Sequence, residues 1–169
     1  PLNMLLLASA LTLAGTAPAA AERIGIVAPL EGAAALLGRQ MLDGATVAAR
    51  DAGVQTVTAD DQCTAEGGEN AALTLVAAQV DIAVGFLCTE AIEAALPVLT
   101  GAGIPVITPG VRSNGITDRR QRESWLVWRT APRADAELAA VGDILVRRWR
   151  DELFAIVDDG TIHGRELAE

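Results

Sequence analysis

Residues 23–58 have the sequence RIGIVAPLEGAAALLGRQMLDGATVAARDAGVQTVT, and this stretch decides the fold. It opens with a short apolar run, Arg23–Ala28, that is typical of a buried strand. Apolar residues then recur at helical spacing until Gly53, where a glycine ends the pattern. Val54–Thr58 is a second β-rich run. The stretch therefore predicts a β-α-β unit with two parallel strands and a helix packed across them.

The same alternation continues along the rest of the chain. Further strands are predicted at Asp81–Phe86, Ile104–Thr108, Leu126–Thr130 and Leu153–Val157, and further helices at Glu69–Gln79, Ile92–Leu99 and Ala134–Trp149. The predicted fold class is α/β, a parallel, doubly wound sheet with helices on both faces. Because the last residues begin a new helical pattern at Gly164, we expect the chain to be a fragment of a longer protein.

Composition excludes several kinds of function. The chain has 169 residues, 51% of them hydrophobic, and a formal net charge of −9. We expect no nucleic-acid partner, because DNA and RNA require a basic face. All 13 basic residues are arginines, and the absence of lysine excludes a P-loop and a Schiff-base enzyme. The sequence has no nucleophile elbow, dinucleotide-binding motif or metal-ligand cluster, so we expect no enzyme activity, no cofactor and no metal site.

The first 21 residues have the features of an export signal. Leu5–Ala21 is apolar and ends in small residues that fit an A-x-A cleavage pattern, and charged residues begin at Glu22. The alternative is a membrane anchor, but the stretch is at the short limit for a span and contains Pro18. We therefore expect residues 1–21 to be a signal peptide and the mature protein to be periplasmic.

Export bears on the two cysteines, Cys63 and Cys88. In an oxidising compartment an even pair of cysteines favours a disulfide. A metal site or a reactive thiol is the alternative, although two cysteines and one distant histidine make a poor zinc set. The pattern favours the disulfide.

The predicted sheet places the binding site. In open α/β sheets, ligands bind beyond the carboxyl ends of the strands, where the strand order reverses. Three loops leave strands at that edge: Pro29–Gly32, Leu87–Glu90 and Pro109–Ser113. Thr89 is suited to cap the helix after the second loop, and the free N–H groups behind it would attract a carboxylate or phosphate.

Short segments from Glu22 to the end of the chain match one known family in order and spacing. They are Ile24–Gly32, Leu37-Gly38, Met41–Ala45, Asp60–Cys63, Gly85–Thr89, Gly103–Gly110, Ile116–Asp118, Trp128–Pro132, Ile156–Gly160 and His163–Arg165. The chain resembles the type I periplasmic binding proteins of the branched-chain amino acid ABC transporter family.

The resemblance implies two α/β lobes that close on a small-molecule ligand, which an ABC permease in the inner membrane then accepts. Residues 22–131 would form most of the first lobe, Pro132 would mark a hinge, and residues 132–169 would begin the second lobe. The implied function is delivery of an amino acid, or a related small polar or carboxylate solute, to an ABC importer. The alternative is an exported ligand-sensing domain of a signalling system.

The resemblance also implies a ligand-binding set, which is Leu37, Cys88, Thr89, Gly110, Arg112 and His163. Thr89 follows the second cysteine, where family members hold the ligand α-carboxylate, and Gly110 matches the glycine whose carbonyl meets the ligand ammonium. Arg112 stands where Thr is usual, Leu37 where an aromatic is common, and His163 where Tyr is common. Because arginine can pair with a carboxylate through two hydrogen bonds, the ligand is expected to be more acidic than leucine, or not an amino acid.

Other polar residues near these loops have structural interpretations. Glu31 and Glu90 are interpreted as surface acids. The pairs Asp60-Asp61 and Asp158-Asp159 are interpreted as strand ends and helix caps.

Overall fold

A five-stranded parallel sheet forms the centre of the computed structural model, which describes residues 22–168. Its strands are β1 (Arg23–Ala28), β2 (Gln55–Asp60), β3 (Ile82–Gly85), β4 (Val106–Thr108) and β5 (Val127–Arg129). They lie in the order β2-β1-β3-β4-β5, and every neighbouring pair is parallel. The predicted α/β fold class is confirmed. The proposed signal peptide, residues 1–21, lies outside the described residues.

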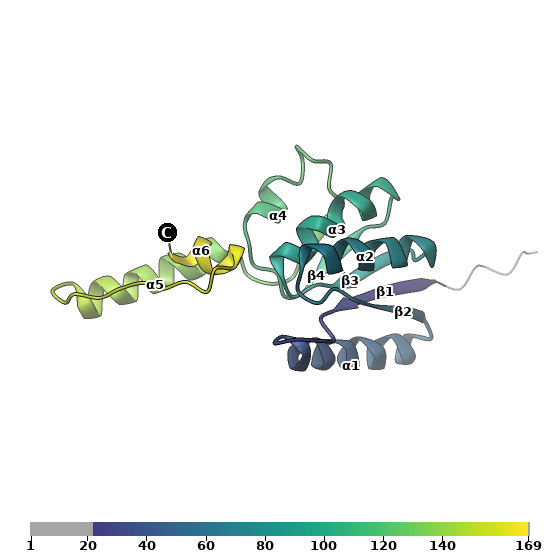
Figure 1. Cartoon of the computed structure of the whole chain (residues 1–169), viewed down its shortest axis with the longest axis horizontal. Helices are drawn as coiled ribbons and strands as arrows, with labels where there is room; N and C mark the ends of the chain where they lie inside the picture. The colour runs from purple at the N-terminus through teal and green to yellow at the C-terminus, as the bar shows by residue number, and fades with distance from the viewer. Residues whose placement is uncertain (1–21, 169) are drawn as a thin grey trace, which may run out of the picture.

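Helices cover both faces of the sheet (Figure 1). Helix α1 (Ala35–Ala52) lies on one face, and α2 (Ala65–Ala77) and α3 (Thr89–Gly101) lie together on the other. The short helix α4 (Gly115–Asp118) follows β4. This arrangement confirms the doubly wound architecture. Among the described residues, no helix is long and apolar enough to cross a membrane.

The main core lies between the sheet and helices α2 and α3. Its large, fully buried side chains are Leu75, Phe86, Ile92, Leu96, Leu99, Val106, Ile116 and Val127. Complete burial of one such side chain contributes about 1.5–3 kcal/mol to folding. The apolar spacing that predicted these elements therefore also identifies the residues that hold α2 and α3 against the sheet.

The order of the strands reverses next to β1. From β1 the chain passes to β2, which pairs with one side of β1. It then crosses over to β3, which pairs with the opposite side of β1. Helix α1 ends as predicted at Gly53, which has a left-handed backbone (φ 70°) that glycine adopts without strain. The carboxyl ends of β1, β3 and β4 lie side by side, so the loops that follow them converge.

Beyond the sheet, the chain forms helix α5 (Ala134–Trp149) and helix α6 (Ile162–Ala168). Figure 1 shows α5 extending away from the sheet and α6 folded back beside α5. The predicted strand Leu153–Val157 is wrong: these residues are exposed and belong to no helix or strand. A β-rich run needs a neighbouring strand to satisfy its N–H and C=O groups, and no described strand lies beside this one. The division into lobes near Pro132 stays a prediction.

Candidate functional site

Two adjoining pockets lie at the carboxyl edge of the sheet. The smaller, of about 170 Å³, is lined by Leu87–Glu90, Gly110–Arg112, Thr161 and His163. The larger, of about 710 Å³, is lined by Glu31, Ala33, Ala34, Leu37, Gln62, Cys63, Cys88, Glu90 and 159–161. Cys88, Glu90 and Thr161 line both pockets. The three loops predicted to form the site therefore do lie together.

All six predicted ligand-binding residues line these pockets. The smaller pocket contains Cys88, Thr89, Gly110, Arg112 and His163. Leu37 lines the larger pocket, on the side of helix α1. The structure thus brings together residues from four separate segments of the chain, while their role in binding stays a prediction.

The turn from β3 to α3 has an unusual backbone. Gly85 has φ 133°, and a Cβ atom there would lie 2.0 Å from the carbonyl oxygen of Val27. Phe86, which is fully buried, also has a positive φ, 63°. A large residue with this backbone is strained and persists only where its surroundings hold it. Here Phe86 N donates to Val27 O over 2.9 Å, so the strained turn is fixed to β1 and places Cys88 and Thr89 at the pocket.

The prediction that Thr89 caps α3 is wrong by one residue. The N-cap is Cys88, which has an extended backbone and makes no side-chain cap hydrogen bond. Thr89 is the first residue of the helix, and it is 4% exposed. The physical reason is that the chain turns helical one residue earlier, with Cys88 O accepting from Ile92 N. The positive end of the α3 dipole still faces the smaller pocket, because Thr89 and Glu90 line it.

Thr108, at the end of β4, joins two of the pocket loops. Its hydroxyl is completely buried, donates to Phe86 O over 3.0 Å, and accepts from Val111 N over 3.2 Å. One side chain therefore fixes the β3–α3 turn to the β4–α4 loop. Sequence reasoning missed this residue, and its only signal was a threonine that ends an apolar strand.

Cys63 and Cys88 form a disulfide, as predicted. The bond joins the loop after β2 to the N-terminus of α3, with Cα atoms 5.2 Å apart. Its formation removes the alternatives of a metal ligand or a reactive thiol. The disulfide lies in the wall of the larger pocket and so fixes two of the loops that shape it.

Asp60 and Asp61 hold the loop after β2. Asp60 Oδ1 accepts from Leu30 N over 2.8 Å and so ties this loop to the loop after β1. Asp61 is completely buried, and its Oδ1 accepts from Cys63 N over 3.1 Å. The interpretation of this pair as helix caps is wrong, because Thr64 caps α2 through its hydroxyl.

Arg112 is held from two sides in the β4–α4 loop. Its carbonyl accepts from Ala134 N (2.9 Å) and from Arg129 Nη1 (3.0 Å). Its guanidinium Nη1 lies 2.7 Å from Glu137 Oε2 on α5. The backbone and the side chain of Arg112 therefore both contact neighbouring elements at the pocket wall.

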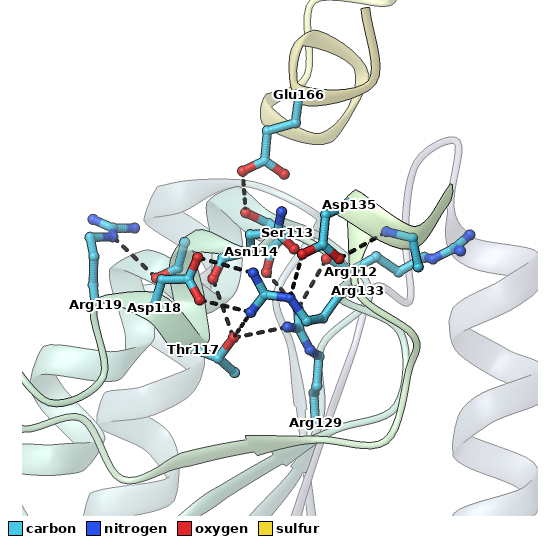
Figure 2. A network of polar contacts seen from close by, with 12 residues as sticks. Arg112, Ser113, Asn114, Thr117, Asp118, Arg119, Arg129, Arg133, Asp135 and Glu166 are labelled. Atoms are coloured by element: carbon cyan, nitrogen blue, oxygen red, sulfur yellow. Dashed lines mark hydrogen bonds and ion pairs between the residues drawn. The ribbon is translucent and has the colours of Figure 1, made fainter. Parts of the chain in front are cut away.

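A polar network connects the β4–α4 loop to α5 and α6 (Figure 2). Arg129 donates to the carbonyl of Ser113 (2.7 Å) and to the hydroxyl of Thr117 (2.9 Å). Arg133 pairs with Asp118 through both terminal nitrogens, and this hydrogen bonding lowers the pKa of Asp118. Sequence reasoning missed these residues, because their partners are brought near only by the fold.

Two contacts join helix α6 to the rest of the site. Ser113 Oγ donates to Glu166 Oε1 over 2.7 Å, as Figure 2 shows. Glu90 Oε1 accepts from Ile162 N, the first residue of α6, over 2.8 Å. Glu90 is half-buried and lines both pockets, so its interpretation as a surface acid is wrong. His163 follows on α6 and is also half-buried.

Comparison with known proteins matches residues 22–169 to a protein family described as periplasmic binding protein. An amino acid binding protein from Pseudomonas aeruginosa is 32% identical over 156 residues, which is 86% of this chain and 41% of that protein. Leu/Ile/Val-binding protein homolog 3 from Brucella melitensis is 28% identical over a similar share. The chain thus spans about 41% of the length of these curated relatives.

Solved structures share the fold. The branched-chain amino acid transporter substrate-binding protein LivJ from Streptococcus pneumoniae, in complex with isoleucine, has a TM-score of 0.67 at 20% identity and covers 76% of this chain and 38% of its own. An ABC transporter solute-binding protein from R. palustris, in complex with 4-hydroxybenzoate, has a TM-score of 0.66 at 17% identity, with 76% and 36% covered. At these identities the likeness concerns the fold alone.

Proposed function

The chain belongs to the periplasmic binding protein family, and on that premise we propose that it is part of an extracytoplasmic solute-binding protein of an ABC importer. The fold is that of a type I periplasmic binding protein, as predicted. The proposed solute is an amino acid or a related small carboxylate. The relatives of the chain support this class of solute, because their names describe amino acid binding and Leu/Ile/Val binding.

The observation that carries this proposal is the convergence of anion-binding groups on one pocket. The N-terminus of α3, Arg112 and His163 all line the smaller pocket, beyond the carboxyl ends of β3 and β4. N–H groups at a helix N-terminus attract negative charge, and an arginine adds a full positive charge beside them. A small carboxylate is the solute class that such a pocket suits.

The proposed roles follow from these positions. Thr89 offers its hydroxyl and the α3 N-terminus to the carboxylate, and Gly110 offers its carbonyl to an ammonium group. Leu37 and Cys88, which line the larger pocket, contact the remainder of the solute. His163 on α6 completes the smaller pocket from the segment after Pro132.

The proposed mechanism is binding without chemistry. Residues 22–131 form the first lobe and residues 132–169 begin the second, and the solute bridges the two and shifts the population to the closed form. An ABC permease in the inner membrane then accepts the solute from the periplasm. The relatives are named as binding proteins, so the alternative of a ligand-sensing domain has no observation in its favour.

A thermal-shift screen of the full-length mature protein tests the proposal. Amino acids, dicarboxylates, aromatic acids and amides are compared, and we expect one class of carboxylate to raise the melting temperature. A ligand present at 100 times its Kd stabilises the folded protein by about 2.7 kcal/mol. Stabilisation only by compounds without a carboxylate, or by none of the compounds, would contradict the proposal.

The variants Thr89→Val and Thr74→Val provide a matched pair for the screen. Thr89 lines the smaller pocket, whereas Thr74 is exposed on α2 and bonds to its own helix. We expect Thr89→Val to reduce the shift given by the best ligand and Thr74→Val to leave it unchanged. Equal shifts in the two variants would remove Thr89 from the proposed site.

A further inference from the structure

Arg112 lies between the smaller pocket and helix α5. Its side chain lines the pocket, and its Nη1 lies 2.7 Å from Glu137 Oε2. The Arg112 side chain is 33% exposed and that of Glu137 is 28% exposed. The pair is therefore partly withdrawn from water, where an ion pair is screened less than on an open surface.

The Arg112 guanidinium has a second edge besides the nitrogen that Glu137 contacts. The Nε and Nη2 atoms of an arginine carry parallel N–H groups that match the two oxygens of a carboxylate. Glu137 lies against Nη1, outside this edge. Within residues 22–168, Arg112 Nε is buried and has no hydrogen-bond partner. Buried donors of this kind are ordinarily satisfied, so Arg112 Nε is a candidate for a hydrogen bond that the described residues do not supply.

The position of Arg112 is fixed from α5. Its carbonyl accepts from the backbone N–H of Ala134, the first residue of that helix, and Glu137 follows one turn later. Helix α5 thus donates a hydrogen bond to the backbone of Arg112 and places the Glu137 carboxylate beside its guanidinium. An arginine that is already ordered loses less conformational entropy when a ligand binds than a free one does.

The other groups of the smaller pocket leave the Arg112 edge to the ligand. Glu90 also lines this pocket, but its Oε1 already accepts from Ile162 N at the start of α6. His163 lines the pocket too, and its buried Nδ1 has no partner in the part of the chain that the structure describes. Two residues that line one small pocket, Arg112 and His163, therefore each carry a buried polar atom that has no partner among residues 22–168.

We infer that the Nε–Nη2 edge of Arg112 binds the ligand carboxylate, and that Glu137 is a positioning residue that orients this edge toward the pocket. The inference rests on the proposed function and narrows it to ligands that carry a carboxylate and whose neutral amides are rejected. Arg–carboxylate hydrogen bonds are charge-assisted and about twice as strong as neutral ones.

The test compares acids with their primary amides, by calorimetry on the full-length protein. The probes are leucine with leucinamide and benzoate with benzamide. We expect the protein to bind the acid of at least one pair at least about tenfold more tightly than its amide. We expect R112Q to remove most of this preference, because only the N-terminus of α3 then remains to favour the charged acid. R112K also loses most of it, because lysine keeps the charge without the planar edge.

Glu137 is tested with E137Q, which keeps the size of the side chain and removes its charge. We expect E137Q to weaken binding of the acid about three- to tenfold and to leave binding of the amide unchanged. A merely structural role would weaken both. The matched controls are E93Q and R119Q, since Glu93 and Arg119 form an ion pair of similar exposure (26% and 35%) and neither lines the two pockets. We expect the controls to change neither affinity.

The outcomes separate the inference from the proposed function. Equal binding of acid and amide, equal losses of both in R112Q, or full retention of the preference in R112K would overturn the inference and leave the binding function standing. Tighter acid binding in E137Q would also overturn it, because Glu137 would then compete with the ligand. Binding of no acid and no amide would overturn the proposed function and the inference with it. The melting temperature of each ligand-free variant verifies that it folds.

Discussion

Gly110 lines the smaller pocket and has little room for an added Cβ atom. A Cβ there would lie 2.5 Å from Leu87 Cδ2 and 3.2 Å from both Leu87 Cα and Phe86 O. The Leu87 side chain can move, but the backbone of the strained turn must move with it. We expect Gly110→Ala to lower the free energy of unfolding by about 1–3 kcal/mol and to weaken ligand binding. Urea unfolding and calorimetry measure the two effects.

Gly44→Ala is the control for this prediction. Gly44 lies in helix α1, and an added Cβ there meets no described atom within 4 Å. We expect this variant to be more stable by about 0.5–1 kcal/mol, because alanine favours the helix. A Gly110→Ala protein with the stability and affinity of the parent would show that the turn tolerates displacement.

Asp61 gives a pH-dependent prediction. Burial raises its pKa above the ordinary value of 3.8, and the charge of Asp60 acts in the same direction, while the N–H of Cys63 opposes it. The folded protein therefore binds this proton more tightly than the unfolded chain does. The stabilising contribution is fully present below pH 3.8 and is lost as the pH rises through the raised pKa.

Asp61→Asn removes this titration and keeps an acceptor for Cys63 N. We expect the variant to unfold at a higher urea concentration than the parent at pH 7, and the difference to shrink as the pH falls toward 3.8. Asp158→Asn, at an exposed position, serves as the control. A difference in urea midpoint between Asp61→Asn and the parent that stays constant across this pH range would contradict the prediction.

The location of the site could be predicted from the sequence, but its polar contacts could not. Neighbouring parallel strands end at one edge, so the loops that carry Thr89 and Arg112 had to meet there. The partners of Glu90 and Arg112 were invisible, because they lie on α6 and α5, far along the chain. Such pairs depend on how separate elements pack, which local sequence patterns do not encode.

At the scale of elements, the disulfide is the covalent link between two loops. It joins the loop after β2 to α3 across a sequence separation of 25 residues. A loop of this length is expected to contribute about 3 kcal/mol to stability. We expect reduction to lower the melting temperature and to weaken ligand binding, because the N-terminus of α3 loses its anchor.

Thermal unfolding with and without a reducing agent measures this effect. The C63S/C88S double variant is the control, since it lacks the bond and should not respond to the reductant. An unchanged melting temperature, together with a thiol assay that shows full reduction, would contradict the prediction.

The sequence predicted the elements of the sheet lobe well and failed beyond it. Alternating β-rich runs and helical spacing located all five strands to within one or two residues, because both faces of the sheet are covered. The run Leu153–Val157 has the same composition but no partner strand. A strand is thus predictable from a local pattern only where its neighbours are present.

At the scale of the whole molecule, the chain has an apolar surface beyond the sheet. It lies on α5 and the segment after it, and we call it the α5 surface. Its exposed residues are Leu138, Val141, Ile144, Val146, Trp149, Leu153, Phe154, Ile156 and Val157. Exposed apolar side chains that lie together bind apolar dyes or partners. We expect residues 22–169, prepared alone, to increase the fluorescence of the dye ANS.

Ile144→Glu tests whether the α5 surface is the source of this signal. Ile144 is 49% exposed, so its replacement should reduce the fluorescence while changing the free energy of unfolding by less than about 0.5 kcal/mol. Val47→Glu on α1, at a position 47% exposed, is the control and should leave the fluorescence unchanged. An equal loss of ANS fluorescence in both variants would show that the dye does not bind mainly to the α5 surface.

The strand order β2-β1-β3-β4-β5 also bears on the sequence of steps by which the sheet can assemble. Once β1 and β2 have paired, each later strand joins a strand that already exists: β3 joins β1, β4 joins β3, and β5 joins β4. No strand from β3 to β5 depends on a later strand for its first partner. The sheet can therefore grow from β1 in chain order, while the outer edge of β2 has no partner strand among the described residues.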